Sequence, residues 1–195
     1  MAMSATAAGR SRSLHILDVA RRLLVEEGLD NFVMRRIAEM CAMKLGNLQY
    51  YFSTRDDLLE AIARAEIAQD VDVITDDALG FEAEQRLANG IKLLAERWVI
   101  SEGSVYIPIG ALALHNERFA KLWAEIYGQF YAALDALIGE IDKTADAAQL
   151  RRRTMLITSL VDGASIQAFA TDQQLIKLDF SHDIQRLAIA IAKGA

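Results

Sequence analysis

The side chains of this sequence that are able to do acid–base, nucleophilic or metal chemistry are few and scattered. The 3 histidines, at positions 15, 115 and 182, do not share the spacing of metal ligands. Cys41 faces inward from a predicted helix, which favours packing over nucleophilic attack. Adjacent carboxylates such as Asp56 and Asp57 would point to different faces of a helix, a poor arrangement for a shared acid–base site. The sequence therefore predicts a protein that is not an enzyme and that needs no cofactor or metal.

Hydrogen bonding to DNA is the chemistry that one stretch of the sequence does favour. Residues Met34–Leu59 predict a short helix, a tight turn, a second short helix and the capped start of a third helix, which is a helix-turn-helix. The second short helix, Leu45–Phe52, would present Asn47, Gln49 and Tyr50 together on its outward face. Asn and Gln amides form paired hydrogen bonds with adenine, and Tyr hydroxyls bond to phosphates.

Small and apolar residues at helical spacing would hold the two short helices together. Ile37 and Ala38 face inward from the first helix, and Leu48 and Phe52 face inward from the second. Ala38 is small enough for the helices to cross closely, so that Leu48 locks into the groove beside it. Ala42 falls in the turn between the helices.

The segments on either side of this motif also show helix signals. Ser13–Glu27 predicts a first helix, capped by one of the serines 11 and 13 and ended by a left-handed Gly28. Residues 1–12 are small, polar and basic, and we expect an arm there. Whether Arg10 and Arg12 touch phosphate or the minor groove, or have no role, stays open. Thr54 should cap the third helix of the motif, which runs to about residue 74.

Composition and charge set limits on the class of protein. A hydrophobic content of 53% excludes a disordered chain, and 1 proline and 11 glycines in 195 residues favour long helices. A single cysteine indicates a reducing compartment, so we expect a cytoplasmic protein. Residues 1–12 lack the apolar segment of a signal peptide, and no apolar run reaches the ~20 residues that cross a bilayer, so no membrane partner is expected.

The net charge of −6 is unevenly distributed along the chain. Residues 1–55 contain 8 basic and 5 acidic side chains, for a net charge of +3. Residues 56–195 contain 13 basic and 22 acidic side chains, for a net charge of −9. A basic N-terminal segment on an acidic body directs a polyanion such as DNA to one end of the molecule.

Several spaced features together resemble the N-terminal domain of the TetR family of one-component transcriptional regulators, over about residues 13–62. They are Ile37-Ala38, the turn, Gly46-x-Leu48, Tyr51-Phe52 and Leu58-Leu59. The resemblance implies that specific side chains contact DNA. These are Arg35, Lys44, Leu45, Asn47, Gln49, Tyr50, Tyr51 and Arg55. For Tyr51, core packing is an open alternative.

The sequence departs from the family pattern at the helix ends and on the reading face. Val33 stands where the family usually has a capping Thr, Ala42 where it has Gly, and Lys44 where it has Ser. A left-handed Ala42 would cost ~1 kcal/mol relative to Gly. Gln49 and Arg55 also differ from the usual residues. These changes alter which base pairs are read without removing the hydrophobic frame.

The rest of the chain predicts further helices but carries no motif. They span Phe81–Ile100, a segment beginning near Pro108, Glu117–Ile141, Leu150–Thr171 and Ser181–Lys193. The first should bury a stripe of Leu87, Ile91, Leu94 and Trp98. Asn116 should cap the helix Glu117–Ile141, whose apolar face would carry Phe119, Trp123, Tyr127, Phe130, Leu134, Leu137 and Ile141. The last two helices are more apolar than one inner stripe requires, and small residues would let helices approach closely: Gly163, Ala164, Ala168 and Ala170. We therefore expect a homodimer through the last two helices.

Aromatic and polar side chains concentrate in the middle of this second part and predict an effector cavity. They are Trp98, Tyr106, His115, Trp123, Tyr127, Phe130 and Tyr131. For each one taken singly, core packing is the alternative, and a capping role is the alternative for His115. Asp162 stands in an apolar stretch of helix, and whether it faces a ligand, the other subunit or water stays open.

These observations combine into one hypothesis. We expect an all-α fold of about nine helices, with a helix-turn-helix DNA-binding domain at 1–53 and a helical effector-binding and dimerisation domain at 54–195. The function implied is a ligand-responsive transcriptional regulator, a repressor that a small-molecule effector releases from a double-stranded DNA operator. The alternative is an all-helical small-molecule-binding protein or enzyme that does not bind DNA.

Overall fold

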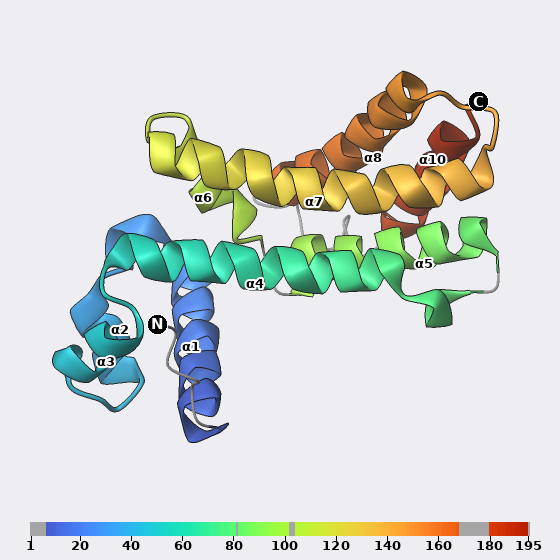
Figure 1. The fold of residues 1–195 in the computed structure, drawn as a ribbon. Coiled ribbons are helices and arrows are strands. Elements are labelled where there is room, and N and C mark those ends of the chain that lie inside the picture. Colours follow the sequence, from blue (N-terminus) through green and yellow to red (C-terminus); the bar gives the residue numbers. More distant parts are fainter. Residues whose placement is uncertain (1–6, 81, 102–103, 168–179, 195) are drawn as a thin grey trace. The chain divides into compact units, whose positions relative to one another are not determined.

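The computed structural model describes residues 7–80, 82–101, 104–167 and 180–194, and the fold there is built from helices (Figure 1). Within those residues there is no strand, which confirms the all-α prediction. The α-helices are α1 Ala7–Asn31, α2 Met34–Met40, α3 Leu45–Tyr51, α4 Arg55–Thr75, α5 Ala83–Ala95, α6 Tyr106–Ala113, α7 Glu117–Ile141, α8 Ala147–Gln167 and α10 Phe180–Lys193. A 3₁₀ turn, η1, covers Asp77–Leu79, and a π-helical turn, η2, covers Glu96–Ser101.

The chain forms two compact units, and each unit contains two separate segments of the sequence. One unit contains the residues up to Glu66 together with Val105–Trp123, and the other contains Ile67–Ser104 together with Ala124–Ala195. Both α4 and α7 therefore begin in the first unit and end in the second. The α6 helix belongs to the first unit, where it contacts α1.

The predicted frame of the helix-turn-helix forms the centre of the first unit. Ile37, Ala38 and Leu48 are all buried, while Phe52 at the end of α3 is only half-buried. α1 and α4 add further buried side chains to this core, including Ile16, Leu23, Leu24, Leu58, Leu59 and Ile62. Each set recurs at the three- and four-residue spacing that lines one face of a helix.

The first helix begins earlier than the sequence predicts. α1 starts at Ala7, so Ser11 and Ser13 lie inside the helix and do not cap it, and residues 7–12 are helical rather than an arm. Residues 1–6 lie outside the described part of the chain. Gly28 has φ 75°, the left-handed conformation expected there, and it kinks the chain before the last turn that ends at Asn31.

The turn between α2 and α3 has the hydrogen bonds of a left-handed helix cap. Ala42 has φ 52°, and its N–H donates to the carbonyl of Glu39 over 3.0 Å. The N–H of Met43 donates to the carbonyl of Ala38 over 2.9 Å. These are the two bonds of a Schellman motif, in which Gly usually occupies the position of Ala42. No side chain caps α2 at Val33 or α3 at Lys44, as the substitutions there predict.

The second unit is built around α5, η2, α8, α10 and the later turns of α7. The stripe of Leu87, Ile91, Leu94 and Trp98 is buried as predicted, although Trp98 lies in the π-helical turn and not in α5. Phe81, where the prediction began this helix, lies outside the described residues. The register of α7 differs from the prediction, because Leu122, Ile126 and Ile138 take interior positions, whereas Trp123, Tyr127 and Ile141 are half-buried.

Polar side chains set the ends of α7 and α8. Asn116 accepts hydrogen bonds from the N–H groups of Arg118 and Phe119, so it caps α7 as predicted. α8 begins at Ala147, not at Leu150, because Asp146 and Gln149 form a reciprocal capping pair. Its last described residue is Gln167, so Ala168, Ala170 and the predicted end at Thr171 lie outside the described part of the chain.

The described helices were also compared with the thickness of a bilayer. None of them combines the length and the apolar composition needed to cross a membrane.

The left-handed turn generates a first prediction. Ala42→Gly should raise the free energy of unfolding by about 1 kcal/mol, because Gly adopts φ 52° without a Cβ clash. Ala68→Gly, at an exposed position inside α4, is the matched control and should lower stability by about as much. Urea unfolding followed by circular dichroism measures both. A loss of stability in Ala42→Gly would show that the turn is not strained.

Candidate nucleic-acid interface

The outward face of α3 carries the side chains predicted to read DNA. Asn47, Gln49 and Tyr50 are exposed, and Tyr50 is 78% exposed. Leu45 and Tyr51 are half-buried, and the Tyr51 ring stands edge-on to Tyr50 with centroids 5.4 Å apart. An exposed phenol and two exposed amides on a two-turn helix are free to meet base edges and phosphates. Their contact with DNA stays a prediction.

A surface hollow of about 620 Å³ lies beside this face. Four of the predicted contact residues line part of it, together with three others: Lys44, Asn47, Tyr50 and Tyr51, with Arg12, Ala42 and Met43. Arg12 comes from the start of α1, so the helical extension of α1 brings a guanidinium to the turn and the reading helix. The sequence signalled the charge of Arg12 but not its place on a helix.

The other predicted basic contacts differ in their exposure and in the hydrogen bonds that they form within the protein. Arg35 on α2 and Lys44 are exposed. The Arg55 guanidinium donates to two carbonyls, that of Phe32 over 2.9 Å and that of Leu29 over 3.0 Å, and lies over the Phe32 ring. Arg55 therefore ties the end of α1 to the start of α4, and phosphate binding would add to that structural role.

The start of α4 is fixed by a reciprocal cap. The N–H of Asp57 donates to the Thr54 hydroxyl over 3.1 Å, and the Thr54 N–H donates to Asp57 Oδ2 over 3.0 Å. Arg118, at the start of α7, donates to Asp57 Oδ1 over 2.7 Å and to Glu60 Oε2 over 2.8 Å. The hydrogen bonds from Arg118 hold the pKa of both carboxyls below their ordinary values. The reading motif is thus bonded, within one unit, to the segment that contains α6.

Further along α4, two carboxylates four residues apart are buried and paired with arginines. In the first unit, Glu66 accepts from Arg21 of α1 over 2.6 Å. In the second unit, Asp70, which is 0% exposed, accepts from Arg97 of η2 over 2.8 Å. Asp70 begins an acidic stretch of the sequence that would favour solvent, but it is buried because Arg97, 27 residues away, supplies the counter-charge.

The aromatic side chains predicted to line an effector cavity separate into pairs. In the first unit, Tyr106 and Trp123 meet edge-on at 6.3 Å, and His115 is exposed. Gly110 allows this packing, because a Cβ there would lie 2.8 Å from the Trp123 ring. In the second unit, the rings of Trp98 and Phe130 are 6.4 Å apart, and those of Tyr127 and Tyr131 are 5.5 Å apart. Whether any of the seven binds a ligand stays a prediction.

Asp162 faces Tyr127 across the α7–α8 seam of the second unit. The Tyr127 hydroxyl donates to Asp162 Oδ2 over 2.8 Å. Burial raises the pKa of the Asp162 carboxyl from 3.8 to about 6, and the bond from Tyr127 opposes that rise only in part. Burial and the nearby Asp162 also raise the pKa of Tyr127 and of Tyr131. A carboxylate held in this state is unusual for a position that serves packing alone.

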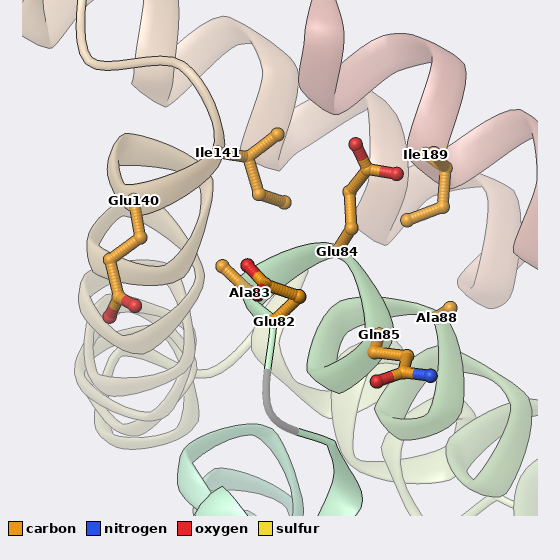
Figure 2. Close-up of a pocket in the computed structure, with 8 residues that line it drawn as sticks. All are labelled: Glu82, Ala83, Glu84, Gln85, Ala88, Glu140, Ile141 and Ile189. Carbon is orange, nitrogen blue, oxygen red and sulfur yellow. The ribbon is translucent and has the colours of Figure 1, made fainter.

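A second hollow of about 530 Å³, drawn in Figure 2, lies at the start of α5. Its lining comes from that helix start, from the end of α7 and from α10: Glu82, Ala83, Glu84, Gln85, Ala88, Glu140, Ile141 and Ile189. None of the seven predicted effector residues is among them. Arginine and lysine already neutralise part of its acidic rim, since Arg86 pairs with Glu140 and Lys193 pairs with Glu84. A rim of glutamates would repel DNA.

The N-terminal part of the chain is similar to a known family. Residues 16–62 match the family described as bacterial regulatory proteins, tetR family. The sequence is 45% identical over 53 residues to an uncharacterized HTH-type transcriptional regulator in the dhlA 5′ region of Xanthobacter autotrophicus, a match that covers 27% of this chain and 26% of that one. Residues 16–62 are therefore similar to the bacterial regulatory proteins of the tetR family.

Longer matches extend the likeness beyond the motif. The HTH-type nicotine-responsive transcriptional repressor HdnoR of Paenarthrobacter nicotinovorans is 24% identical over 165 residues, covering 82% of this chain and 84% of that one. The crystal structure of a TetR transcription regulator from Haloarcula marismortui has the same fold, with a TM-score of 0.72, 22% identity and coverage of 95% and 98%. A segment of 8-amino-7-oxononanoate synthase from Thermosipho melanesiensis is 30% identical over 103 residues, which is 26% of that enzyme.

The buried carboxylate generates a second prediction. Between pH 3.8 and about 6 the folded state binds more protons at Asp162 than the unfolded state, so ionisation of Asp162 lowers stability as pH rises through that range. Asp162→Asn keeps an acceptor for Tyr127 and removes the charge. It should raise the free energy of unfolding by about 2–3 kcal/mol at pH 7.5.

The gain should shrink to about 0.5 kcal/mol at pH 4, where the folded carboxyl is protonated and the unfolded one, with a pKa of 3.8, is only partly ionised. Urea unfolding of both proteins at pH 7.5 and pH 4 measures the difference between their free energies of unfolding. The titration of Asp57, Glu60 and other groups that both proteins share cancels in that difference. Equal stability of the two proteins at pH 7.5 would contradict the predicted cost of burying this charge.

Proposed function

We propose that this chain is a homodimeric repressor that binds a double-stranded DNA operator through α3 and is released from it by a small-molecule effector. The observation that carries the proposal is the geometry of α3. One side of the helix is anchored by a fully buried Leu48, and the opposite side presents Asn47, Gln49 and Tyr50 to solvent. A helix that is held from behind and polar in front fits the major groove.

The basic groups around α3 support the same proposal. Arg12 from α1 and Lys44 from the turn line the hollow beside α3, and Arg35 is exposed on α2. Contacts to phosphate by such groups position a reading helix and carry most of the salt dependence of binding. The functional division that we propose assigns 1–53 to DNA binding and 54–195 to effector binding and dimerisation.

A symmetric dimer is supported by apolar side chains that remain exposed on α8 and α10. Met155, Leu156 and Ile166 on α8 are 49%, 56% and 57% exposed, and Leu187 on α10 is 48% exposed. Gly163 lies on the same side of α8, and a Cβ added there would meet no atom within 4 Å. Ala164, in contrast, is buried in the chain's own core. Two reading helices, one from each subunit, would double the contacts and fix the spacing of half-sites.

Release by an effector requires a path from the ligand to the reading helix. We propose that α4 supplies it, because its first turn is bonded to Arg118 and its middle turns carry Glu66 and Asp70, each paired with an arginine. An effector then acts only through its different affinity for the DNA-binding and released conformations. The nicotine-responsive relative gives a precedent for a small organic effector.

The DNA-binding proposal predicts the effect of a single reading residue. Asn47→Ala should weaken binding to DNA from upstream of the gene for this chain by about tenfold or more, since a paired amide–adenine contact contributes ~1–3 kcal/mol. Gln129→Ala, an exposed amide on α7, is the matched control and should bind as the wild type does. A gel-shift titration measures both. Equal binding by all three proteins, or no specific binding by any, would refute the assignment of α3.

The dimer proposal predicts a change of mass. Leu156→Glu places a charge in the exposed apolar surface of α8 and should convert a dimer to a monomer in sedimentation analysis, with a parallel loss of DNA affinity. Leu114→Glu, at a leucine that is 78% exposed beyond the end of α6, is the control and should leave the mass unchanged. A dimer that persists in Leu156→Glu would exclude α8 as its interface.

A further inference from the structure

We propose that Asp162, Tyr127 and Tyr131 form a binding site for a small organic cation, either a protonated amine or a quaternary ammonium ion. All three side chains belong to the second unit, on facing helices α7 and α8. The proposal rests on the proposed function only in calling this cation the effector. Binding of the cation itself can be measured without DNA.

The first argument is the unbalanced charge of Asp162. Its Oδ2 accepts the hydrogen bond from Tyr127, while Oδ1 accepts none from the residues that the structure describes. No lysine, arginine or histidine in that part of the chain forms an ion pair with it, although the neighbouring carboxylate of Asp135 pairs with Arg151 at 2.6 Å. A partly buried carboxylate without a counter-ion is costly, and a cation bound against Oδ1 would remove that cost.

The second argument is the arrangement of the two tyrosine rings. Tyr127 and Tyr131 are one helical turn apart on α7, with centroids 5.5 Å apart and planes at 87°. The edge-to-face contact fixes the two rings against each other, with Tyr127 bonded to Asp162, and an aromatic ring face beside a carboxylate attracts an ammonium group. The Tyr131 ring already attracts a cation in this structure, because the Arg151 guanidinium carbon lies 5.2 Å from its centroid.

The third argument is access. Asp162, Tyr127 and Tyr131 are each partly exposed, so a solute reaches them without unfolding the seam. Gly128 follows Tyr127 on α7, and a Cβ added there would meet no atom within 4 Å. A carboxylate oxygen, aromatic surfaces and open space beside Tyr127 are what an ammonium ion requires, whereas an anion would be repelled.

The experiment compares cations with neutral molecules of the same shape. Full-length protein at pH 7.5 is titrated calorimetrically with benzylamine and choline, and with their uncharged analogues benzyl alcohol and 3,3-dimethyl-1-butanol. We expect at least one cation to bind ten or more times as tightly as its analogue. Asp162→Asn should abolish that preference, and Asp183→Asn, at an exposed aspartate on α10 that pairs with Arg186, should preserve it.

A second variant keeps the test decisive if the charge change disturbs folding. Tyr131→Leu retains an apolar side chain and removes the ring, so cation affinity should fall about tenfold while circular dichroism is unchanged. If the wild type binds neither cation, or binds each cation no more tightly than its neutral analogue, the proposed cation site is wrong. Dissociation of the dimer by Asp162→Asn without an effect on cation binding would instead make Asp162 a subunit contact and would also overturn it.

Gel shifts with the same protein separate this inference from the proposed function. A protein that binds DNA and ignores both cations refutes the ammonium site and leaves the regulator intact. A protein that binds a cation through Asp162 but no DNA refutes the regulator and leaves the site. Release of DNA by the cation in the wild type, and not in Asp162→Asn, is the result expected if both are right.

Discussion

The presentation of the reading helix depends on one backbone conformation, the left-handed turn at Ala42. Its two hydrogen bonds, from Ala42 to Glu39 and from Met43 to Ala38, close α2 and set the direction in which α3 departs. Helices of 7 residues without side-chain caps are far too short to be stable alone. They persist because Leu48 is fully buried against the core of the unit, so tertiary packing, and not helix propensity, holds the reading face in place.

The polar partners of α4 are arranged along its length, as the proposed path from effector to DNA requires. Its first turn shares Asp57 between a helix cap and Arg118, and one face further on carries Glu66 and Asp70. Buried ion pairs add little net stability, but separating their partners leaves a charge uncompensated and costs several kcal/mol. α4 is therefore tied to Arg21 in one unit and to Arg97 in the other. The presence of Arg97 in a π-helical turn, a geometry frequent at functional sites, suits a point where ligand binding would act.

The features that could be predicted from the sequence are those fixed by nearby residues. The frame of Ile37, Ala38 and Leu48, the caps at Thr54 and Asn116 and the positive φ of Gly28 each depend on a few neighbours. Features fixed by residues distant in the sequence were not predicted. Arg118 donates to Asp57, 61 residues away, and Arg97 pairs with the buried Asp70. The register of α7 was missed because aromatic and aliphatic side chains occupy both flanks of the stripe, so hydrophobicity alone does not choose between Tyr127 and Ile126.

The reading residues and the folding residues of α3 are nearly separate sets. Leu48 is 0% exposed and determines the fold, whereas Asn47, Gln49 and Tyr50 are exposed and contribute little to it. Substitutions on the exposed face would change stability slightly and, in the proposed interface, would alter the base pairs that the helix reads. The buried set is enough to keep the fold, which is shared with a structure of 22% identity. Arg55 is the exception, since it donates to the carbonyls of Phe32 and Leu29 and is also a predicted DNA contact, so its loss would lower stability and, in the proposed interface, DNA affinity together.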